Sequence, residues 1–242
     1  MKISNKLFIY IIVIQVAVIL SGCSQNNEIA KYEEPIELKY QIEEYANTPF
    51  PVLDENINLT EVNRFESDNI VQVLYTKEDD SSLYCYLEIN TIKYDLGALN
   101  YIISPVENTE SYRLEKTSID YKNTIYKIAR VEGAASLGYD YFTINDNMPT
   151  LLYTLYYSDE INNNDEIISV SSFGIPSYTC IYKWSSDGIY LCDINSFLGC
   201  DYANFYKSNM TIEIIKAINF NKPAENIHEF FNLIGDKLVP LN

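Results

Sequence analysis

The chain has 242 residues, of which 47% are hydrophobic, and its 34 acidic and 17 basic residues give a formal net charge of −17. This apolar content excludes a chain that is disordered throughout. The acidity disfavours binding to nucleic acids and to anionic lipid headgroups, because both repel negative charge. Its 22 tyrosines, which fit half-buried pleated surfaces, favour β-strands. We expect a mostly β protein of one or two domains with a sizeable core.

The first 22 residues have the pattern of a secretory signal peptide. Lys2 and Lys6 come before an apolar run over residues 7–20, and the small residues Ser21 and Gly22 follow it. The alternative is a membrane-spanning helix, which needs about 20 apolar residues. The run is shorter than that, so we predict a signal peptide over residues 1–22.

Cys23 stands directly after Leu20-Ser21-Gly22. This arrangement resembles the lipobox of bacterial lipoproteins, and the resemblance implies cleavage before Cys23 and a diacylglyceryl group on its sulfur. Two acyl chains anchor a protein stably, whereas one does so only marginally. The expected location is therefore the cell membrane, lipid-anchored, on its extracytoplasmic face. An ordinary signal peptide with an unmodified Cys23 is the alternative.

Residues 23–45 are polar and rich in Glu, which is typical of a flexible tether between an anchor and a folded domain. An added edge strand or a short helix over 36–45 is the alternative. Pro49 and Pro51 mark the expected entry to the folded part, and we predict a β-repeat domain over 46–242.

From about residue 67 onward, β-rich runs alternate with polar turns. The recurrence of several strands about every forty residues predicts an all-β antiparallel meander of about four blade-like repeats, arranged as a propeller or as a sandwich. Residues 229–241 are expected to form a hairpin around Gly235-Asp236, with a helix as the alternative. The runs expected as strands are 70–75, 83–89, 92–96, 125–131, 140–144, 151–155, 167–170, 179–184, 189–194, 203–206, 211–218, 229–234 and 237–241.

Three short stretches in the second half of the chain form a recognisable set: Asp165–Ile168, Ile181–Trp184 and Gly235–Pro240. Through them, residues 118–241 resemble lipoproteins of Gram-positive bacteria and, more distantly, FG-GAP or VCBS repeats. Those repeat families often hold calcium in a turn of the type Asp-x-Asp-x-Asp-Gly.

The matching acidic turn, 159–166, lacks the glycine and most of the alternating acids. Calcium takes six to eight oxygen ligands, and Asn162, Asn164 and Asp165 are the candidates. A solvated Asn-Asp turn explains the same residues, since both types favour turns. We therefore expect no cofactor, with calcium as the alternative.

Four cysteines follow Cys23 in the chain. A four-residue turn over 185–188 would pair Trp184 with Ile189, and so Cys180 with Asp193. Because side chains alternate between faces, Cys192 would then point away from Cys180. No Cys-x-x-Cys spacing supports a zinc or redox site. We expect buried thiols rather than disulfides at Cys85, Cys180, Cys192 and Cys200.

Motifs that would indicate an enzyme are missing. The one histidine, His228, has a Glu neighbour and is expected at a surface or a strand end. Residues 133–138 contain Gly-x-x-Ser-x-Gly, which has the wrong spacing for a nucleophile elbow. A hydrolase that uses paired carboxylates stays open, because 34 acids allow many pairs. The sequence favours a non-enzymatic module that binds an envelope protein or a glycan, and a carboxylate-dependent envelope hydrolase is the alternative.

Overall fold

The computed structural model describes residues 32–67, 69–78, 80–100, 109–119, 122–132, 136–163, 166–173, 177–217 and 226–241. Glu34–Asn242 form one compact unit. The predicted signal peptide and Cys23 lie outside the described residues. Within the described ranges, no helix is long and apolar enough to cross a membrane.

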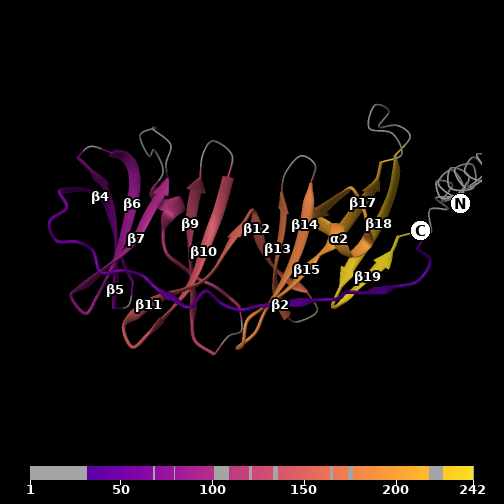
Figure 1. Ribbon diagram of the computed structural model, residues 1–242, viewed down its shortest axis with the longest axis horizontal. Helices are drawn as coiled ribbons and strands as arrows, with labels where there is room; N and C mark the ends of the chain where they lie inside the picture. Colours follow the sequence, from indigo (N-terminus) through magenta and orange to yellow (C-terminus); the bar gives the residue numbers. More distant parts are fainter. Residues whose placement is uncertain are drawn as a thin grey trace, which may run out of the picture. The chain divides into compact units, whose positions relative to one another are not determined.

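The described chain is all-β, and its strands form antiparallel sheets, as predicted (Figure 1). The first sheet has nine strands, in the order β3-β11-β10-β9-β7-β6-β5-β4, with β8 on β9. In it, β7 and β9 meet in parallel at Asn100 and Val131. This contact joins two meanders, one of four strands and one of three. The first is β4 (Leu59–Ser67), β5 (Ile70–Lys77), β6 (Asp80–Ile89) and β7 (Ile92–Asn100), and the second is β9 (Ile125–Glu132), β10 (Ser136–Asn145) and β11 (Met148–Tyr156). The two remaining strands of the sheet are β3 (Thr48–Pro49) and β8 (Glu115–Lys116).

Two five-stranded sheets follow in the chain. The second sheet has the order β12-β13-β14-β15-β2, and the third has the order β1-β19-β18-β17-β16. The predicted hairpin over 229–241 is confirmed, since β18 pairs with β19. The strands are β12 (Ser158–Asn163), β13 (Glu166–Phe173), β14 (Tyr178–Trp184), β15 (Ile189–Asp193) and β2 (Gln41–Glu43), then β1 (Ile36–Glu37), β16 (Tyr202–Tyr206), β17 (Thr211–Lys216), β18 (Ile227–Ile234) and β19 (Lys237–Pro240).

Short helical turns connect some of these strands. They are the 3-10 turns η1 (Thr109–Tyr112) and η2 (Lys207–Asn209), and the helix α2 (Ile194–Leu198). Asp193 caps the start of α2, because its carboxylate accepts from the backbone of Ser196. Gly199 ends the helix in the left-handed conformation, with φ of 59°. Neither α2 nor the nine-residue strand β4 was predicted from the sequence.

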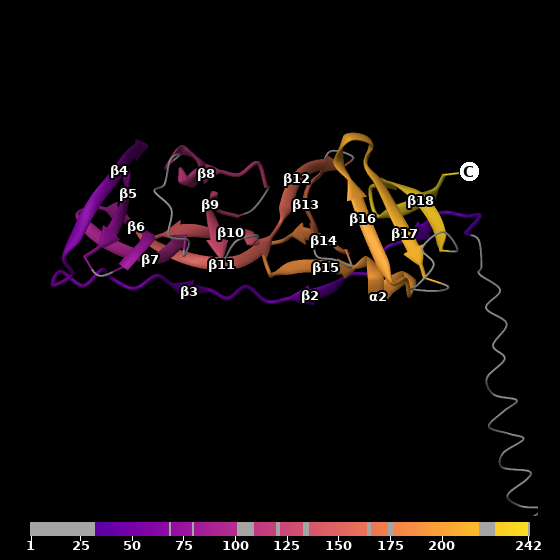
Figure 2. The ribbon, with the colours of Figure 1, turned by 90° about the horizontal axis from the view of Figure 1, so that it is seen from above.

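The segment over residues 36–53, here called the strap, adds one edge strand to each of the three sheets (Figures 1 and 2). Its β1 pairs with β19, its β2 with β15 and its β3 with β11. Val52 then bridges to Tyr94 of β7. The prediction of a flexible tether up to residue 45 therefore needs correction, and the edge strand that was its alternative is what the structure shows.

The strap is polar in sequence because an edge strand buries only a few of its side chains. Leu38, Tyr45 and Leu53 are buried, while both residues of β3 are exposed. The Tyr45 hydroxyl donates to the carbonyl of Ser185 at 2.6 Å, and its ring stacks on Trp184. Such sparse burial leaves no hydrophobic period in the sequence, which is why the segment resembles a linker.

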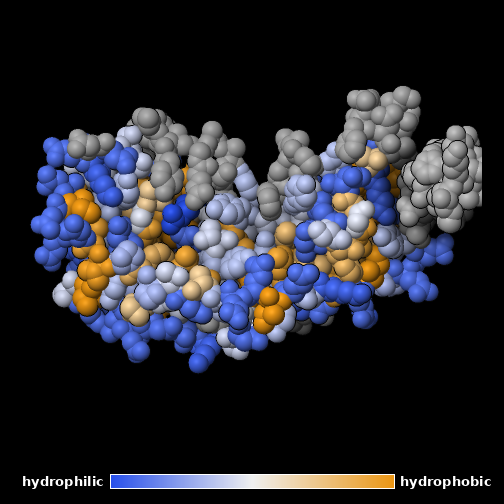
Figure 3. Space-filling view, in the orientation of Figure 1, coloured by the Kyte–Doolittle hydropathy of each residue, from blue (hydrophilic) through white to orange (hydrophobic). Residues whose placement is uncertain are grey.

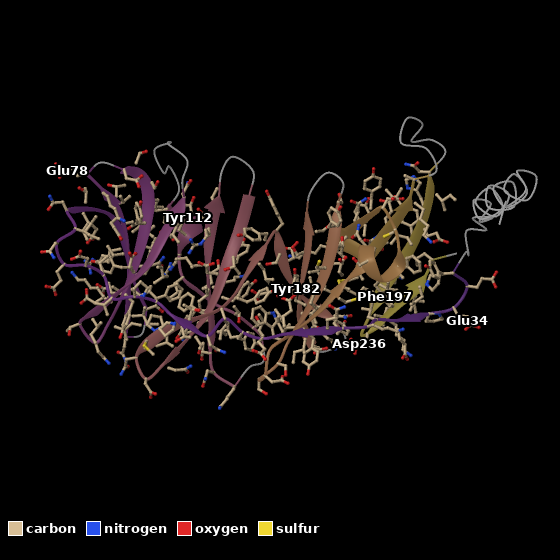
Figure 4. All side chains as sticks on the ribbon, in the orientation of Figure 1. Glu34, Glu78, Tyr112, Tyr182, Phe197 and Asp236 are labelled. Atoms are coloured by element: carbon tan, nitrogen blue, oxygen red, sulfur yellow. The ribbon has the colours of Figure 1, made fainter. Side chains whose placement is uncertain are left out.

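A second link joins the strap to two sheets. Lys183 of β14 lies 2.8 Å from Asp236, in the β18–β19 turn, and 2.8 Å from Glu166. Its ammonium group also lies over the ring of Tyr40, whose hydroxyl donates to Asp236. Figure 4 labels Asp236 beside the strap. The strap and the second and third sheets therefore share one cation.

The first sheet contains a buried ion pair. Arg130 on β9 donates from Nε and Nη2 to Asp140 on β10 and also to the carbonyls of Leu96 and Ala98. Thr154 on β11 donates to the other carboxylate oxygen of Asp140 at 2.7 Å. The pair thus has hydrogen-bond partners on all sides, which is what makes a buried charge tolerable.

Candidate binding surface on the third sheet

One face of the third sheet carries polar and aromatic side chains, while the centre of the opposite face is apolar. Because side chains alternate along a strand, every second residue of β16, β17 and β18 lies on the same face. The apolar face holds Ala203, Ile212, Ile214, Phe231 and Leu233, all buried. We call the other side the β16–β18 face; its members are Tyr202, Asn204, Tyr206, Thr211, Glu213, Ile215, His228, Phe230, Asn232 and Ile234.

Glu213 is the centre of the β16–β18 face. Asn204 lies directly across from it on β16 and donates to Oε2 at 3.1 Å. The hydroxyl of Tyr206 donates to the same oxygen at 2.7 Å. On the other flank, Nδ1 of His228 lies 2.8 Å from Oε1. The carboxylate can only accept in these contacts, so His228 donates from Nδ1.

These contacts keep Glu213 ionised. Burial alone would raise the pKa of Glu213, but the hydrogen bonds from His228, Tyr206 and Asn204 outweigh it and hold the pKa below its usual value. A glycosidase-type general acid needs the opposite, a raised pKa that keeps its proton near neutral pH. Glu213 is therefore a positioning residue for its neighbours and is a poor candidate for a general acid.

The ring of Tyr206 is held against the sheet. Its backbone pairs with Thr211, while its hydroxyl reaches Glu213, two residues further along β17. The hydrogen bond therefore fixes the hydroxyl end of the side chain over β17, while 45% of the residue stays exposed. Phe230 lies directly across from Glu213 on β18 and is 41% exposed. Two exposed rings thus flank a fixed carboxylate.

A hollow of about 340 Å³ lies at one end of the β16–β18 face. Asn232 and Ile234 extend the line of Phe230 along β18 into it, and Thr211 fixes the amide of Asn232 by donating to Oδ1 at 3.3 Å. The seven described residues that line the hollow are all uncharged, and four of them are asparagines. They are Asn162, Asn163, Asn209, Met210, Asn232, Leu233 and Ile234.

Asn163 joins the second sheet to this hollow. Its Nδ2 donates to the carbonyl of Gly235 at 2.8 Å, and its Oδ1 accepts from the amide of Gly235 at 2.9 Å. Gly235 is the turn residue between β18 and β19 and has φ of 55°, a conformation that glycine adopts without strain. Lys207 adds an ion pair with Asp159, at 2.7 Å, between η2 and β12.

Comparison of the chain with protein-family models, curated proteins and solved structures found no match. The surface is therefore interpreted from its own residues.

Of the residues predicted as a calcium site, Asn162 lies in the described part of the chain. Asn162 lies in strand β12 and is exposed, whereas the sequence placed it in an acidic turn over 159–165. That expectation needs correction, because Ser158–Asn163 pair with Glu166–Ser171 as a strand. Asn164 and Asp165 lie outside the described residues. Within the described ranges, no group of three or more His, Cys, Asp or Glu residues is placed to hold a metal ion.

The predicted register of the β14–β15 hairpin is confirmed. Trp184 pairs with Ile189, and Cys180 pairs with Asp193. The four cysteines after Cys23 are free thiols, and Cys85 and Cys192 are buried. Burial raises the pKa of Cys85 to about 12, and that of Cys180, Cys192 and Cys200 to about 11. At neutral pH these thiols stay protonated and make poor nucleophiles.

Glu213 was not among the predicted site residues, although its position in the sequence carries a signal. Residues 211–216 read Thr-Ile-Glu-Ile-Ile-Lys, so Glu213 alternates with Ile212 and Ile214 and must lie on the other face of its strand. The strand itself was predicted. The sequence does not give the pairing register of β16, β17 and β18. That register brings Asn204, 9 residues before Glu213, and His228, 15 residues after it, beside this carboxylate.

Proposed function

We propose that the protein is a lipid-anchored module on the extracytoplasmic face of the cell membrane, and that it binds an envelope component without catalysis. The β16–β18 face carries this proposal, because exposed Tyr206 and Phe230 flank a fixed polar centre. Exposed aromatic rings on a rigid scaffold are typical of binding surfaces. Figure 3 shows one side of the molecule, where hydrophobic side chains form several groups between hydrophilic ones.

We also infer that the fold repeats a blade-like unit four times. The meanders β4–β7, β9–β11, β12–β15 and β16–β19 follow one another in the chain and have similar lengths. Repeated sheets of this kind offer wide surfaces for binding. In this proposal the fourth unit presents the binding face, and the strap holds the units together.

The predicted anchor would keep this face near the membrane. Cys23 and the first strap strand at Ile36 are 13 residues apart, so the intervening chain spans at most about 45 Å when fully extended. Because β1 pairs with β19, the chain would enter the fold in the same sheet that carries the β16–β18 face.

Fractionation of cells tests the anchor. We expect Cys23→Ala to move the protein from the membrane fraction to the soluble fraction, because the diacylglyceryl group has no sulfur to attach to. Cys200→Ala is the matched control and should leave the protein in the membrane fraction. Unchanged membrane retention of Cys23→Ala would contradict a lipid anchor at this residue.

Sedimentation with isolated envelopes tests the binding face. The full chain, solubilised in detergent, is mixed with envelope material that has been extracted free of lipid. We expect the double variant Tyr206→Ala/Phe230→Ala to remain in the supernatant while the wild type sediments. Ile92→Ala, which removes a side chain that is 43% exposed on the first sheet, is the control. Equal sedimentation of wild type and double variant would refute binding through this face.

A further inference from the structure

Phe230 and the hollow follow one line along β18, whereas Tyr206 lies to the side of that line, in the cross-strand row that runs through Thr211 to Asn232. Phe230, Asn232 and Ile234 are successive residues on the same side of β18, and the hollow begins at Asn232. Two residues of a strand advance by about 6.6 Å, so Phe230 and Ile234 are about 13 Å apart. Tyr206 lies two strands away from Phe230, with Glu213 between them. The surface is long enough for several units of a linear chain.

The side chains on this line match one kind of chemistry. Asparagine amides both donate and accept hydrogen bonds, so Asn209 and the Nδ2 group of Asn232 suit hydroxyl and amide groups, which do the same. The amide of Asn163 is already bonded to Gly235 and shapes the hollow instead. Exposed Tyr and Phe rings pack against the apolar C–H faces of a flat ring. The volume of about 340 Å³ falls within the range of about 300–1,000 Å³ that is usual for small-molecule sites.

Charge narrows the class of ligand further. The chain carries a net charge of −17, which repels anionic polymers such as nucleic acids. The described residues that line the hollow are uncharged, and the carboxylate of Glu213 already accepts three hydrogen bonds. Among these described residues a cationic ligand would therefore find no available negative charge, whereas a neutral ligand needs none.

We propose that the β16–β18 face and its hollow bind an uncharged linear oligosaccharide. A terminal or side-chain sugar unit occupies the asparagine-lined hollow, the following unit stacks on Phe230 along β18, and the ring of Tyr206 contacts the chain from the side of β16. Glu213 acts as a positioning residue, because its carboxylate accepts from the hydroxyl of Tyr206 and so holds the ring of Tyr206 in place. This inference rests on the proposed function, because it names the envelope component that the face would bind.

Calorimetric titration of the full chain in detergent tests the proposal. The probes are neutral hexasaccharides of N-acetylglucosamine and of glucose, with a hexasaccharide of galacturonic acid as the anionic comparison and one of glucosamine as the cationic comparison. We expect at least one neutral probe to bind and the galacturonic acid probe not to bind. Phe230→Ala and Tyr206→Ala should each weaken that binding about tenfold or more, since each removes one stacking ring. Ile92→Ala should leave it unchanged.

A second variant separates loss of the ligand contact from loss of the fold. Asn209 is exposed on η2, so Asn209→Asp keeps the size of the side chain and adds one charge to the hollow. We expect this variant to keep the melting temperature of the wild type, to bind the neutral probe more weakly and to bind the glucosamine probe more tightly. Tyr206→Phe, which keeps the ring but removes its bond to Glu213, should fall between wild type and Tyr206→Ala.

Two results would overturn the proposal. One is that neither neutral probe binds the wild type; the other is that a neutral probe binds equally well to the wild type and to both ring variants. If the neutral probes fail while the ring variants still lose sedimentation with envelopes, the oligosaccharide inference falls and the proposed function stands. If sedimentation is also unaffected, both fall.

Discussion

The strap can be tested at a single glycine. Gly188 ends the turn between β14 and β15, and the strap crosses it closely: a Cβ atom added there would lie 2.5 Å from the carbonyl oxygen of Glu43. Gly188 is not among the glycines with positive φ, so its backbone suits alanine. Alanine at such a position normally stabilises a protein by about 0.4–1 kcal/mol, through the unfolded state. A loss of stability in Gly188→Ala would therefore come from the strap.

The expected size follows from the clash. Overpacking against a neighbour that cannot move freely costs about 1–3 kcal/mol, so the net loss is about 1–2 kcal/mol after the gain in the unfolded state. For a domain of this size, 1 kcal/mol shifts the melting temperature by about 2–4 °C, which gives a fall of about 2–8 °C. Calorimetry measures this shift. Ser186→Ala, an exposed change in the same turn, is the control and should stay within about 0.5 kcal/mol of the wild type.

Hydrogen exchange shows where stability is lost. The amide of Ala46 donates to the carbonyl of Leu152, and that of Leu38 donates to the carbonyl of Asp236. We expect faster exchange in Gly188→Ala at Ala46, which is close to the clash, and a smaller change at Leu38. A melting temperature at or above that of the wild type, with unchanged exchange at Ala46, would refute the close crossing of strap and turn.

Three further predictions concern single side chains. Arg130→Ala should lower the free energy of unfolding, measured by denaturant titration, by about 3–5 kcal/mol, because it leaves the carboxylate of Asp140 buried and unpaired. Arg64→Ala is the control and should lower it by at most about 1 kcal/mol, because the ion pair of Arg64 with Glu61 is exposed. Similar losses in the two variants would contradict the buried ion pair. Glu213→Gln should lower stability at neutral pH by about 1.5–3 kcal/mol. Folding lowers the pKa of Glu213, so its contribution to the free energy of unfolding is full above the unfolded pKa of 4.5 and disappears as the pH falls through the folded pKa. The melting temperatures of wild type and Glu213→Gln should therefore converge in acid. A difference in melting temperature that stays constant with pH would contradict the lowered pKa. Thiol titration of the unfolded mature protein should find four reactive cysteines if Cys23 carries a lipid and five if it does not, and the native protein should react slowly at neutral pH.

The sequence by itself determined the class of fold and most of the strands. Alternation of apolar and polar residues between Asn- and Gly-containing turns is a local signal, which is why the β14–β15 register and the β18–β19 hairpin could both be predicted. The same local logic placed Glu213 on a strand. The N-terminal residues 1–23 lie outside the described part of the chain, so the signal peptide and the lipid on Cys23 stay predictions.

Only the tertiary structure decided what the strap does and what surrounds Glu213. An edge strand such as β2 forms by backbone hydrogen bonds to a distant partner, so its own sequence needs little hydrophobic pattern and resembles a linker. The β16–β18 face depends on the register of three strands, and its hollow depends on Asn163 of the second sheet meeting the Gly235 turn of the third. Pairings between residues far apart in the chain leave no local trace, and they are what create this surface.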